Sequence, residues 1–429
     1  MNQVNFAISI LIFIGTLFLV IRKPKGIPIG YSAMIGAVAT ALFGFTTFID
    51  LMNVINIVWN ATLTFISVVI MALVFDEAGV FEYLASRLMS HARGSGRRLY
   101  LFVIIIGSFI SAIFANDGTA IVLTPIMVAL LYRAGLEKKA IIAYVMVVGF
   151  IADSASLPLL VSNLVNIIAA TYFGISFFPY MELMILPDLA SIGSSLLFLY
   201  LYFRKSIPDT IPVDISYSKD EIKDPFLFEI FFPTIVILIL LYSIGGFYSI
   251  PVSIVSMPTA AVLIILSKRG GRIDYIKPVK DAPWQIILFS LGMYIVVYAL
   301  ANNGLVQITA YSVLTFTKMP PILTYILTGY LFAFTASIMN NLPSVLLGDL
   351  TLASVHAPRL LLLTNAIGND IGPKFTTIGS LATLVWLYML EKKSNLKIRS
   401  IEYMKVGISV GLPVLTIALL TLWLESLLI

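Results

Sequence analysis

Long apolar runs follow one another along most of this chain, and short polar or charged intervals separate them. A run of about 20 apolar residues is long enough to cross the hydrocarbon core of a bilayer as a helix. The pattern predicts single crossings at residues 6–21, 27–45, 55–75, 184–201, 230–244, 251–266, 286–300 and 404–423. The chain is therefore expected to be an all-α polytopic membrane protein.

Basic residues follow the first apolar run and do not precede it. Arg22, Lys23 and Lys25 come directly after residue 21. A secretory signal peptide carries its basic residues before the apolar segment. We therefore expect residues 6–21 to be a retained membrane helix.

Two longer apolar stretches are interrupted in the middle by polar residues. Asn116-Asp117-Gly118 interrupts residues 99–131, and Asn340-Asn341 interrupts residues 322–358. Each unsatisfied peptide group at membrane depth costs several kcal/mol, so non-helical backbone survives there only beside protein or a water-filled cavity. We predict that both stretches are helical hairpins with the polar break at the tip.

Two other crossings, residues 140–170 and 360–390, are broken near their middle. The first contains Asp153-Ser154-Ala155-Ser156-Leu157-Pro158, and the second contains Asp370-Ile371-Gly372-Pro373-Lys374. Proline removes a backbone donor, and Asp and Ser compete for backbone hydrogen bonds, so these helices are expected to be unwound there. Discontinuous helices of this kind are typical of secondary transporters.

Several landmarks recur in the same order about 220 residues apart, which indicates an internal repeat. The pairs are Pro28 and Pro251, Trp59 and Trp284, Gly79 and Gly304, Asn116 and Asn340, and Asp153 and Asp370. Lys and Arg in short loops stay cytoplasmic, and this rule gives the helices that begin at Pro28 and Pro251 opposite directions. The sequence thus predicts an inverted-topology repeat transporter with two helical hairpins and two discontinuous transmembrane helices.

The same pattern predicts the domain organisation. The predicted segments are an N-terminal membrane helix and basic loop at 1–26, the first repeat at 27–203, a cytoplasmic linker at 204–229, a connecting membrane helix at 230–250 and the second, inverted repeat at 251–429.

Composition supports this class and excludes others. The chain is 59% hydrophobic and 11% charged with a mean hydropathy of +1.00, far from the composition of a soluble domain. Its net charge of +5 lies in short loops, so topology explains it better than nucleic-acid binding does. The chain has no cysteine and two histidines, which argues against disulfides, metal sites and thiol chemistry. We expect no cofactor.

Four charged side chains lie inside the predicted membrane segments, namely Asp117, Asp153, Asp370 and Lys374. An Asp or Lys at a helix centre costs roughly 2.5–3.5 kcal/mol, so function explains them better than structure alone. A buried carboxylate suits proton coupling, because burial favours its protonated form and a nearby cation favours its charged form. Helix capping by Asp117 and Asp153, and an i,i+4 ion pair between Asp370 and Lys374, are the structural alternatives.

Neutral hydrogen-bonding side chains gather at the same breaks. The predicted substrate-binding residues are Asn116, Thr119, Ser154, Ser156, Asn163, Asn340, Asn341, Thr376, Thr377 and Ser380. Such a site suits a small neutral polyhydroxylated solute or a partly dehydrated cation, and it suits a polyanion poorly. Helix N-termini at both breaks would favour an anion, which leaves a dicarboxylate or sulfate open. Helix packing by small residues is the alternative for each Ser and Thr.

Outside the breaks, Glu182, Asp188 and Asp349 are expected to be surface carboxylates near the membrane interfaces. Residues 76–98 carry apolar side chains at helical spacing with charged residues between them. This pattern is typical of an amphipathic helix that lies in the interface.

With its breaks and their flanking residues, the chain resembles the ArsB family of arsenite efflux permeases, within the larger ion transporter superfamily. The matching strings lie at 59–62, 114–118, 149–153, 156–159, 161–167, 282–286, 289–294, 337–341, 372–374 and 378–384. They occur in order over almost the whole chain. Leu342-Pro343-Ser344 departs conservatively from the Met-Pro-Thr of the family.

The resemblance implies extrusion of arsenite and antimonite in exchange for protons across the bacterial inner membrane. It also implies that some relatives associate with a soluble ATPase subunit. Arsenite is a neutral trihydroxide at neutral pH, which agrees with the neutral site inferred above. The lack of cysteine agrees as well, because thiolates would hold trivalent arsenic too tightly to release it.

Two alternatives remain open. Within the same superfamily, a sodium/proton antiporter or an anion transporter would share these breaks. A different class is an intramembrane protease that uses Asp153 and Asp370 as paired aspartates. The Gly-X-Gly-Asp pattern of that chemistry is absent, because Asn369 precedes Asp370.

Overall fold

The computed structural model describes residues 3–211, 222–394 and 396–428, and these residues form helices and connecting segments without a β-strand. Nine helical stretches in this described part are long and apolar enough to cross a membrane. The prediction of an all-α polytopic membrane protein is confirmed. Residues 212–221 of the predicted cytoplasmic linker lie outside the described residues.

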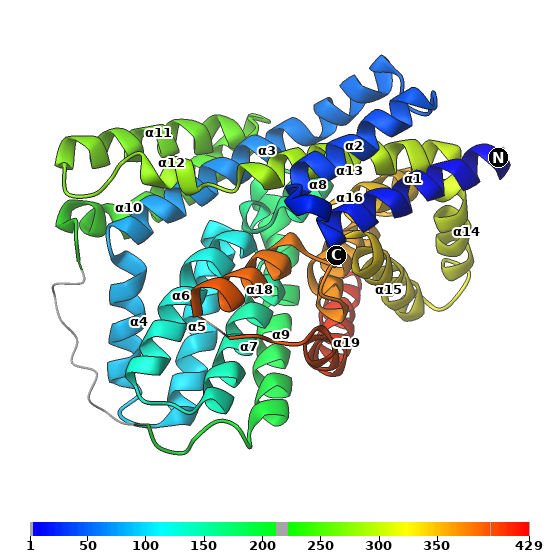
Figure 1. Ribbon diagram of the computed structural model, residues 1–429. Helices are drawn as coiled ribbons and strands as arrows, with labels where there is room; N and C mark the ends of the chain where they lie inside the picture. Colours follow the sequence, from blue (N-terminus) through cyan, green and yellow to red (C-terminus); the bar gives the residue numbers. More distant parts are fainter. Residues whose placement is uncertain (1–2, 212–221, 395, 429) are drawn as a thin grey trace.

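The elements of the two halves follow the same order along the chain (Figure 1). The first half contains α1 (Gln3–Arg22), η1 (Pro24–Gly26), α2 (Ile29–Leu42), α3 (Phe48–Glu77), α4 (Val80–His91), α5 (Gly96–Phe114), α6 (Asn116–Arg133), α7 (Lys138–Ser154), η2 (Leu160–Ser162), α8 (Leu164–Tyr172) and α9 (Phe177–Phe203). The second contains α10 (Pro225–Phe247), α11 (Val252–Gly270), α12 (Lys277–Asp281), α13 (Trp284–Leu300), η4 (Ala301–Leu305), α14 (Val306–Phe316), α15 (Pro321–Met339), α16 (Asn341–Ser354), α17 (Arg359–Ile371), η5 (Gly372–Phe375), α18 (Leu381–Ser394) and α19 (Ser400–Glu425). The series from α2 to α9 thus corresponds to the series from α11 to α19.

Two glycines mark the same point in both halves. Gly79 (φ 85°) separates α3 from α4, and Gly304 (φ 135°) lies in the π-helical segment that joins α13 to α14. Positive φ is readily available to glycine and strained for other residues. The recurrence of these two glycines therefore reflects the same change of chain direction in each repeat. The short helices α12 and α14 are not among the predicted runs.

Each repeat caps a helix of the other repeat with a side-chain amide. Asn60 Oδ1 accepts a hydrogen bond of 3.1 Å from the backbone N–H of Ser253, at the start of α11. Gln285 Oε1 accepts one of 3.2 Å from the N–H of Gly30, at the start of α2. These amides satisfy free donors of a helix N-terminus. The reciprocal arrangement is the one expected for two repeats related by a pseudo-two-fold axis.

Helix packing follows the same reciprocity. Helix α2 packs against α13 and α11 against α3, while α9 packs against its counterpart α19 (Figure 1). Across the breaks, α8 packs against α16 of the second hairpin and α18 against α6 of the first. Small residues permit the close approach, since a Cβ at Gly292 would lie 2.6 Å from the Ala33 backbone.

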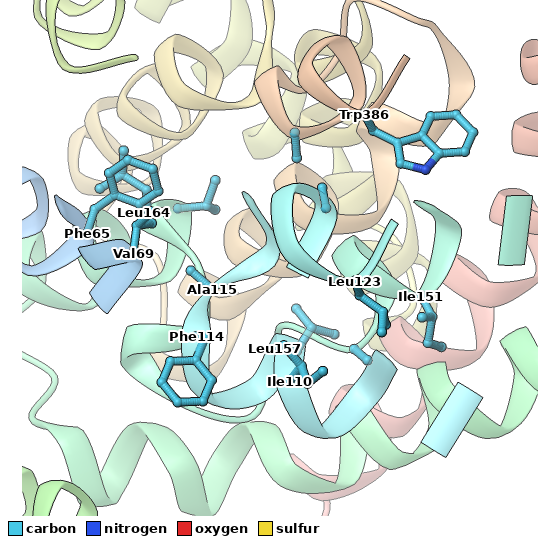
Figure 2. Close-up of a cluster of buried hydrophobic side chains, with 14 of the residues drawn as sticks. Phe65, Val69, Ile110, Phe114, Ala115, Leu123, Ile151, Leu157, Leu164 and Trp386 are labelled. Carbon is cyan, nitrogen blue, oxygen red and sulfur yellow. The ribbon is translucent and has the colours of Figure 1, made fainter. Parts of the chain in front are cut away.

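An apolar shell surrounds the first hairpin tip. Phe75, Phe81, Phe114 and Phe231 form a cluster with ring centroids 5.0–6.1 Å apart. Figure 2 shows buried apolar side chains of several helices around Ala115, the residue after Phe114. This shell packs around the tip, where Ala115 and Asn116 are buried.

Candidate functional site

Each hairpin turns on a single residue with an unusual backbone conformation. Ala115 (φ 64°, ψ 156°) joins α5 to α6, and Asn340 (φ 78°, ψ 148°) joins α15 to α16. Such conformations cost of order 1–3 kcal/mol in residues other than glycine, and they cluster at ligand-binding and switch regions. The two hairpin tips thus share one strained backbone geometry.

This geometry corrects the predicted correspondence of the tips by one residue. Ala115 and Asn340 are equivalent in backbone conformation, so Asn116 corresponds to Asn341 and Asp117 to Leu342. The prediction that paired Asn116 with Asn340 was wrong, because it aligned the two tips by residue type and not by backbone conformation. A positive φ with ψ near 150° is open to glycine and strained for other residues, and alanine occupies it in one repeat and asparagine in the other.

The first broken crossing leaves helix at α7 and resumes at α8, and side chains satisfy the backbone between them. Asn166 Nδ2 donates to the Ser156 carbonyl at 2.7 Å. Asp188 Oδ1 on α9 accepts from the Leu157 N–H at 3.3 Å. These contacts replace the helical hydrogen bonds lost before Pro158.

The predicted surface position of two carboxylates is wrong. Asp188 and Asp349 are 3% and 0% exposed, whereas Glu182 is exposed as predicted. Asp188 is buried because its carboxylate accepts a hydrogen bond from the unwound backbone that follows α7. Asp349 accepts a hydrogen bond of 2.8 Å from Asn365 Nδ2. Buried carboxylates need such partners.

The second broken crossing is fixed by the second hairpin. Asn340 Nδ2 donates to the Ile378 carbonyl at 3.1 Å, and the Asn341 N–H donates to the Gly379 carbonyl at 2.8 Å. Thr376 Oγ1 donates to the Ser337 carbonyl at 2.6 Å. The tip of the hairpin and the broken helix therefore form one hydrogen-bonded unit.

A buried ion pair joins the two repeats at their breaks. Lys374 Nζ lies 2.7 Å from Asp153 Oδ2, and both side chains are at most 2% exposed. Lys374 also donates to the Gly149 carbonyl, and Asn116 Nδ2 donates to Asp153 Oδ1 at 2.9 Å. One tip and both broken helices thus meet at Asp153.

The alternative of an i,i+4 ion pair between Asp370 and Lys374 is contradicted. Among the described residues the ion-pair partner of Lys374 is Asp153. Helix α17 ends at Ile371, and Gly372-Pro373 begins the 3₁₀ segment η5, which carries Lys374. The change of helical pitch breaks the alignment that i,i+4 spacing gives on an α-helix.

Asp370 receives neutral donors from the first repeat. Ser156 Oγ lies 2.9 Å from both Asp370 carboxylate oxygens, and Asn163 Nδ2 donates to Asp370 Oδ1. Because Ser156 and Asn163 flank the first break, this contact ties α17 to the unwound segment after α7. The two predicted aspartates of the breaks, Asp153 and Asp370, therefore lie in one polar cluster.

Asp117 has a different environment from the other two carboxylates. It is 7% exposed, and its Oδ1 has no hydrogen-bond partner in the described part of the chain. It belongs to none of the ion pairs among the described residues. Asp117 is thus the carboxylate of this centre whose charged form is least compensated.

The remaining predicted residues lie at the edge of the cluster. Thr119 Oγ1 donates to the Ala115 carbonyl at 3.1 Å within its own helix. Ser154 Oγ accepts from Ser195 Oγ at 3.1 Å and so faces α9. Ser380 is buried and Thr377 is half-buried, both in the segment before α18. Sequence reasoning missed Asn166, which the spacing Asn163-x-x-Asn166 beside a proline break could have indicated.

A glycine of α19 gives η5 the room to hold Lys374. A Cβ at Gly407 would lie 1.7 Å from the Lys374 carbonyl oxygen, so Gly407→Ala must displace that backbone. We expect a loss of about 1–3 kcal/mol in the free energy of unfolding, measured by thermal unfolding of the purified protein. Gly193→Ala is the matched control, since a Cβ there meets nothing within 4 Å. Equal stability of both variants would contradict this packing.

Comparisons with known proteins agree on one family. The family model described as arsenical pump membrane protein matches residues 8–425. The chain is 43% identical over 416 residues to the arsenical pump membrane protein of Escherichia coli strain K12, which covers 96% of this chain and 97% of the relative. It is 26% identical over 426 residues to the putative arsenical pump membrane protein of Bacillus subtilis, with coverage of 93% and 95%.

Among solved structures, the chain is similar to the YdaH transporter of Alcanivorax borkumensis, whose crystal structure reveals an unusual topology. The TM-score is 0.56 with 13% sequence identity, and the similarity covers 89% of this chain and 88% of the other. At this identity the comparison concerns the fold alone. It supports the helical fold described above.

Proposed function

The chain belongs to the arsenical pump membrane protein family, and we propose that it extrudes arsenite and antimonite, as neutral trihydroxides, in exchange for protons. The membrane is the bacterial inner membrane, with the basic loops in the cytoplasm. The proposal keeps the division into repeats at 27–203 and 251–429. Association with a soluble ATPase subunit is not required by this mechanism.

The proposal rests on the different environments of three neighbouring carboxylates. Two of them have a cation or hydrogen-bond donors that stabilise the charged form, and the third has neither among the described residues. Asp153 is neutralised by Lys374, and Asp370 accepts from Ser156 and Asn163. Asp117 has neither a cation nor a donor for its buried Oδ1 in the described chain. A carboxylate left in this state gains most from binding a proton. Asp117 is therefore the proposed proton-exchange site.

Neutral side chains at the breaks support the choice of substrate. The amides of Asn116 and Asn341 and the hydroxyls near the breaks can donate to or accept from a trihydroxide. An anion would meet three carboxylates here and one lysine, Lys374, which Asp153 already neutralises. A neutral solute avoids this electrostatic cost. Hydrogen bonds to amides and hydroxyls are also weak enough to release the substrate.

The proposed cycle couples substrate and proton at Asp117. In the charged form, Asp117 accepts a hydrogen bond from a substrate hydroxyl. Protonation from the outer side removes that acceptor and releases the substrate outward. Loss of the proton to the cytoplasm restores the binding form. In this cycle the second hairpin tip moves together with the second broken helix, because Asn340 and Asn341 are bonded to the second break.

A vesicle assay separates this proposal from its rivals in the same superfamily. Everted vesicles that contain the protein are given an acid interior, reported by a quenched pH-sensitive dye. We expect arsenite or antimonite to restore fluorescence, because their uptake exports protons from the lumen, and sodium or sulfate to leave it quenched. A response to sodium without arsenite would favour a sodium/proton antiporter and contradict the proposal.

A further inference from the structure

A polar cavity of about 460 Å³ opens beside the first hairpin, away from the cluster at the breaks. Its walls come from the C-terminal end of α3, from α6, from α12 with the residues after it, and from α18. Helices of both repeats thus form it. Its lining includes Asp76, Glu77, Ile121, Pro125, Lys277 and Asp281.

The cavity lies on the face of α6 that carries Asp117. Asp117, Ile121 and Pro125 are spaced by four residues, which places them on one side of the helix. At about 1.5 Å per residue, Ile121 is about one turn from Asp117 and Pro125 about two turns. Helix α3 contacts α6 next to Asp117, since a Cβ at Gly118 would lie 3.8 Å from the Ala72 Cβ. The cavity therefore ends at Ile121, about one helical turn from Asp117.

Loop charge places the mouth of this cavity on the cytoplasmic side. Its lining includes Lys277 of the basic interval 268–280, which the positive-inside rule keeps in the cytoplasm. The lining itself is acidic, with three carboxylates and one lysine. Lys277 forms an ion pair with Glu77 that joins α12 to α3. Asp76 and Asp281 have no cation of their own among the described ion pairs.

We propose that this cavity is the cytoplasmic entrance to Asp117 and that Asp76 and Asp281 make it selective against anions. This inference rests on the proposed function, because it names the route and the charge class of the substrate. Charged residues that line a narrow passage repel ions of the same sign. A neutral trihydroxide crosses such a mouth without that barrier, whereas phosphate, arsenate and dicarboxylates are repelled.

The absence of cysteine from the chain allows a direct test. Ile121→Cys introduces a single thiol in the cavity wall. In everted vesicles, where the cytoplasmic face is outside, the thiol is treated with membrane-impermeant methanethiosulfonates that carry either a trimethylammonium or a sulfonate group. We expect the cationic reagent to react at least about tenfold faster than the anionic one. Ser90→Cys on the exposed end of α4 is the accessibility control and should show no preference for the cation.

Removal of the two unpaired carboxylates tests the role of charge. In Ile121→Cys with Asp76→Asn and Asp281→Asn, the remaining Glu77 and Lys277 neutralise each other. We expect the preference for the cationic reagent to disappear, while Ser90→Cys in the same background reacts as before. An unchanged ratio of the two rates would overturn the proposed charge selection. No reaction at Ile121→Cys, while Ser90→Cys reacts, would overturn the entrance itself.

Substrate protection separates this inference from the proposed function. Antimonite should slow the labelling of Ile121→Cys and leave that of Ser90→Cys unchanged, which excludes a general reaction of antimonite with thiols. Cation-selective labelling without protection by arsenite or antimonite would support the entrance and contradict the proposed substrate. Protection without cation selectivity would support the substrate and contradict the filter.

Discussion

Replacement of Lys374 with methionine is expected to lower the free energy of unfolding by about 3–5 kcal/mol, because it leaves a buried charge without its partner. Lys374 is fully buried, and its Nζ lies 2.7 Å from Asp153 Oδ2. Methionine has a similar length and no charge, so the change removes mainly the electrostatic partner. Thermal unfolding of the detergent-purified protein measures the loss.

The double variant gives the control for this prediction. Asp153→Asn together with Lys374→Met removes both charges, and it should recover most of the lost stability, because a neutral pair no longer requires compensation. The Asn side chain can still accept the hydrogen bond from Asn116 Nδ2. If the double variant is as unstable as Lys374→Met, the ion pair does not account for the burial of these charges.

Replacement of Asp117 with asparagine is expected to abolish proton-driven arsenite transport while the protein remains folded. Asparagine has the same shape but cannot bind or release a proton. Accumulation in everted vesicles should fall to the level of vesicles without the protein. The melting temperature should not fall, because the change removes a buried carboxylate whose Oδ1 has no partner among the described residues.

A surface aspartate provides the matched control for Asp117→Asn. Asp209 lies beside Arg97, and its side chain is 81% exposed. Asp209→Asn makes the same chemical change outside the site, and it should retain transport. Full proton-driven transport by Asp117→Asn would show that another group carries the proton. Loss of both transport and folding would indicate a structural role for Asp117.

The sequence was sufficient to locate the polar interruptions of the apolar runs and to identify them as hairpin tips or broken helices. Asn116, Asp153, Asn340 and Asp370 each interrupt an apolar run, and the structure has a hairpin tip or a broken helix at each of them. These predictions were possible because a polar residue at membrane depth has a large and local energetic cost. The repeat was detectable for a similar reason, since Gly79 and Gly304 serve a backbone conformation that strongly favours glycine.

The sequence did not predict which side chains of one repeat pair with side chains of the other across the pseudo-two-fold axis. The spacing of Asp370 and Lys374 suggested an intrahelical pair, yet Lys374 bonds to Asp153 of the other repeat. Hydropathy also misplaced Asp188, because its partner, the Leu157 N–H, becomes free only when another helix unwinds. The acidic cavity was missed since Asp76 and Asp281 come together only when α3 and α12 are packed.

Arsenite uptake by everted vesicles with and without a proton gradient tests directly whether the protein exchanges arsenite for protons. With an acid interior, we expect arsenite to accumulate against its concentration gradient and a protonophore to abolish the accumulation. Vesicles that contain Asp117→Asn should behave like protonophore-treated vesicles under both conditions. Equal accumulation of arsenite with and without the gradient would contradict proton exchange at this site.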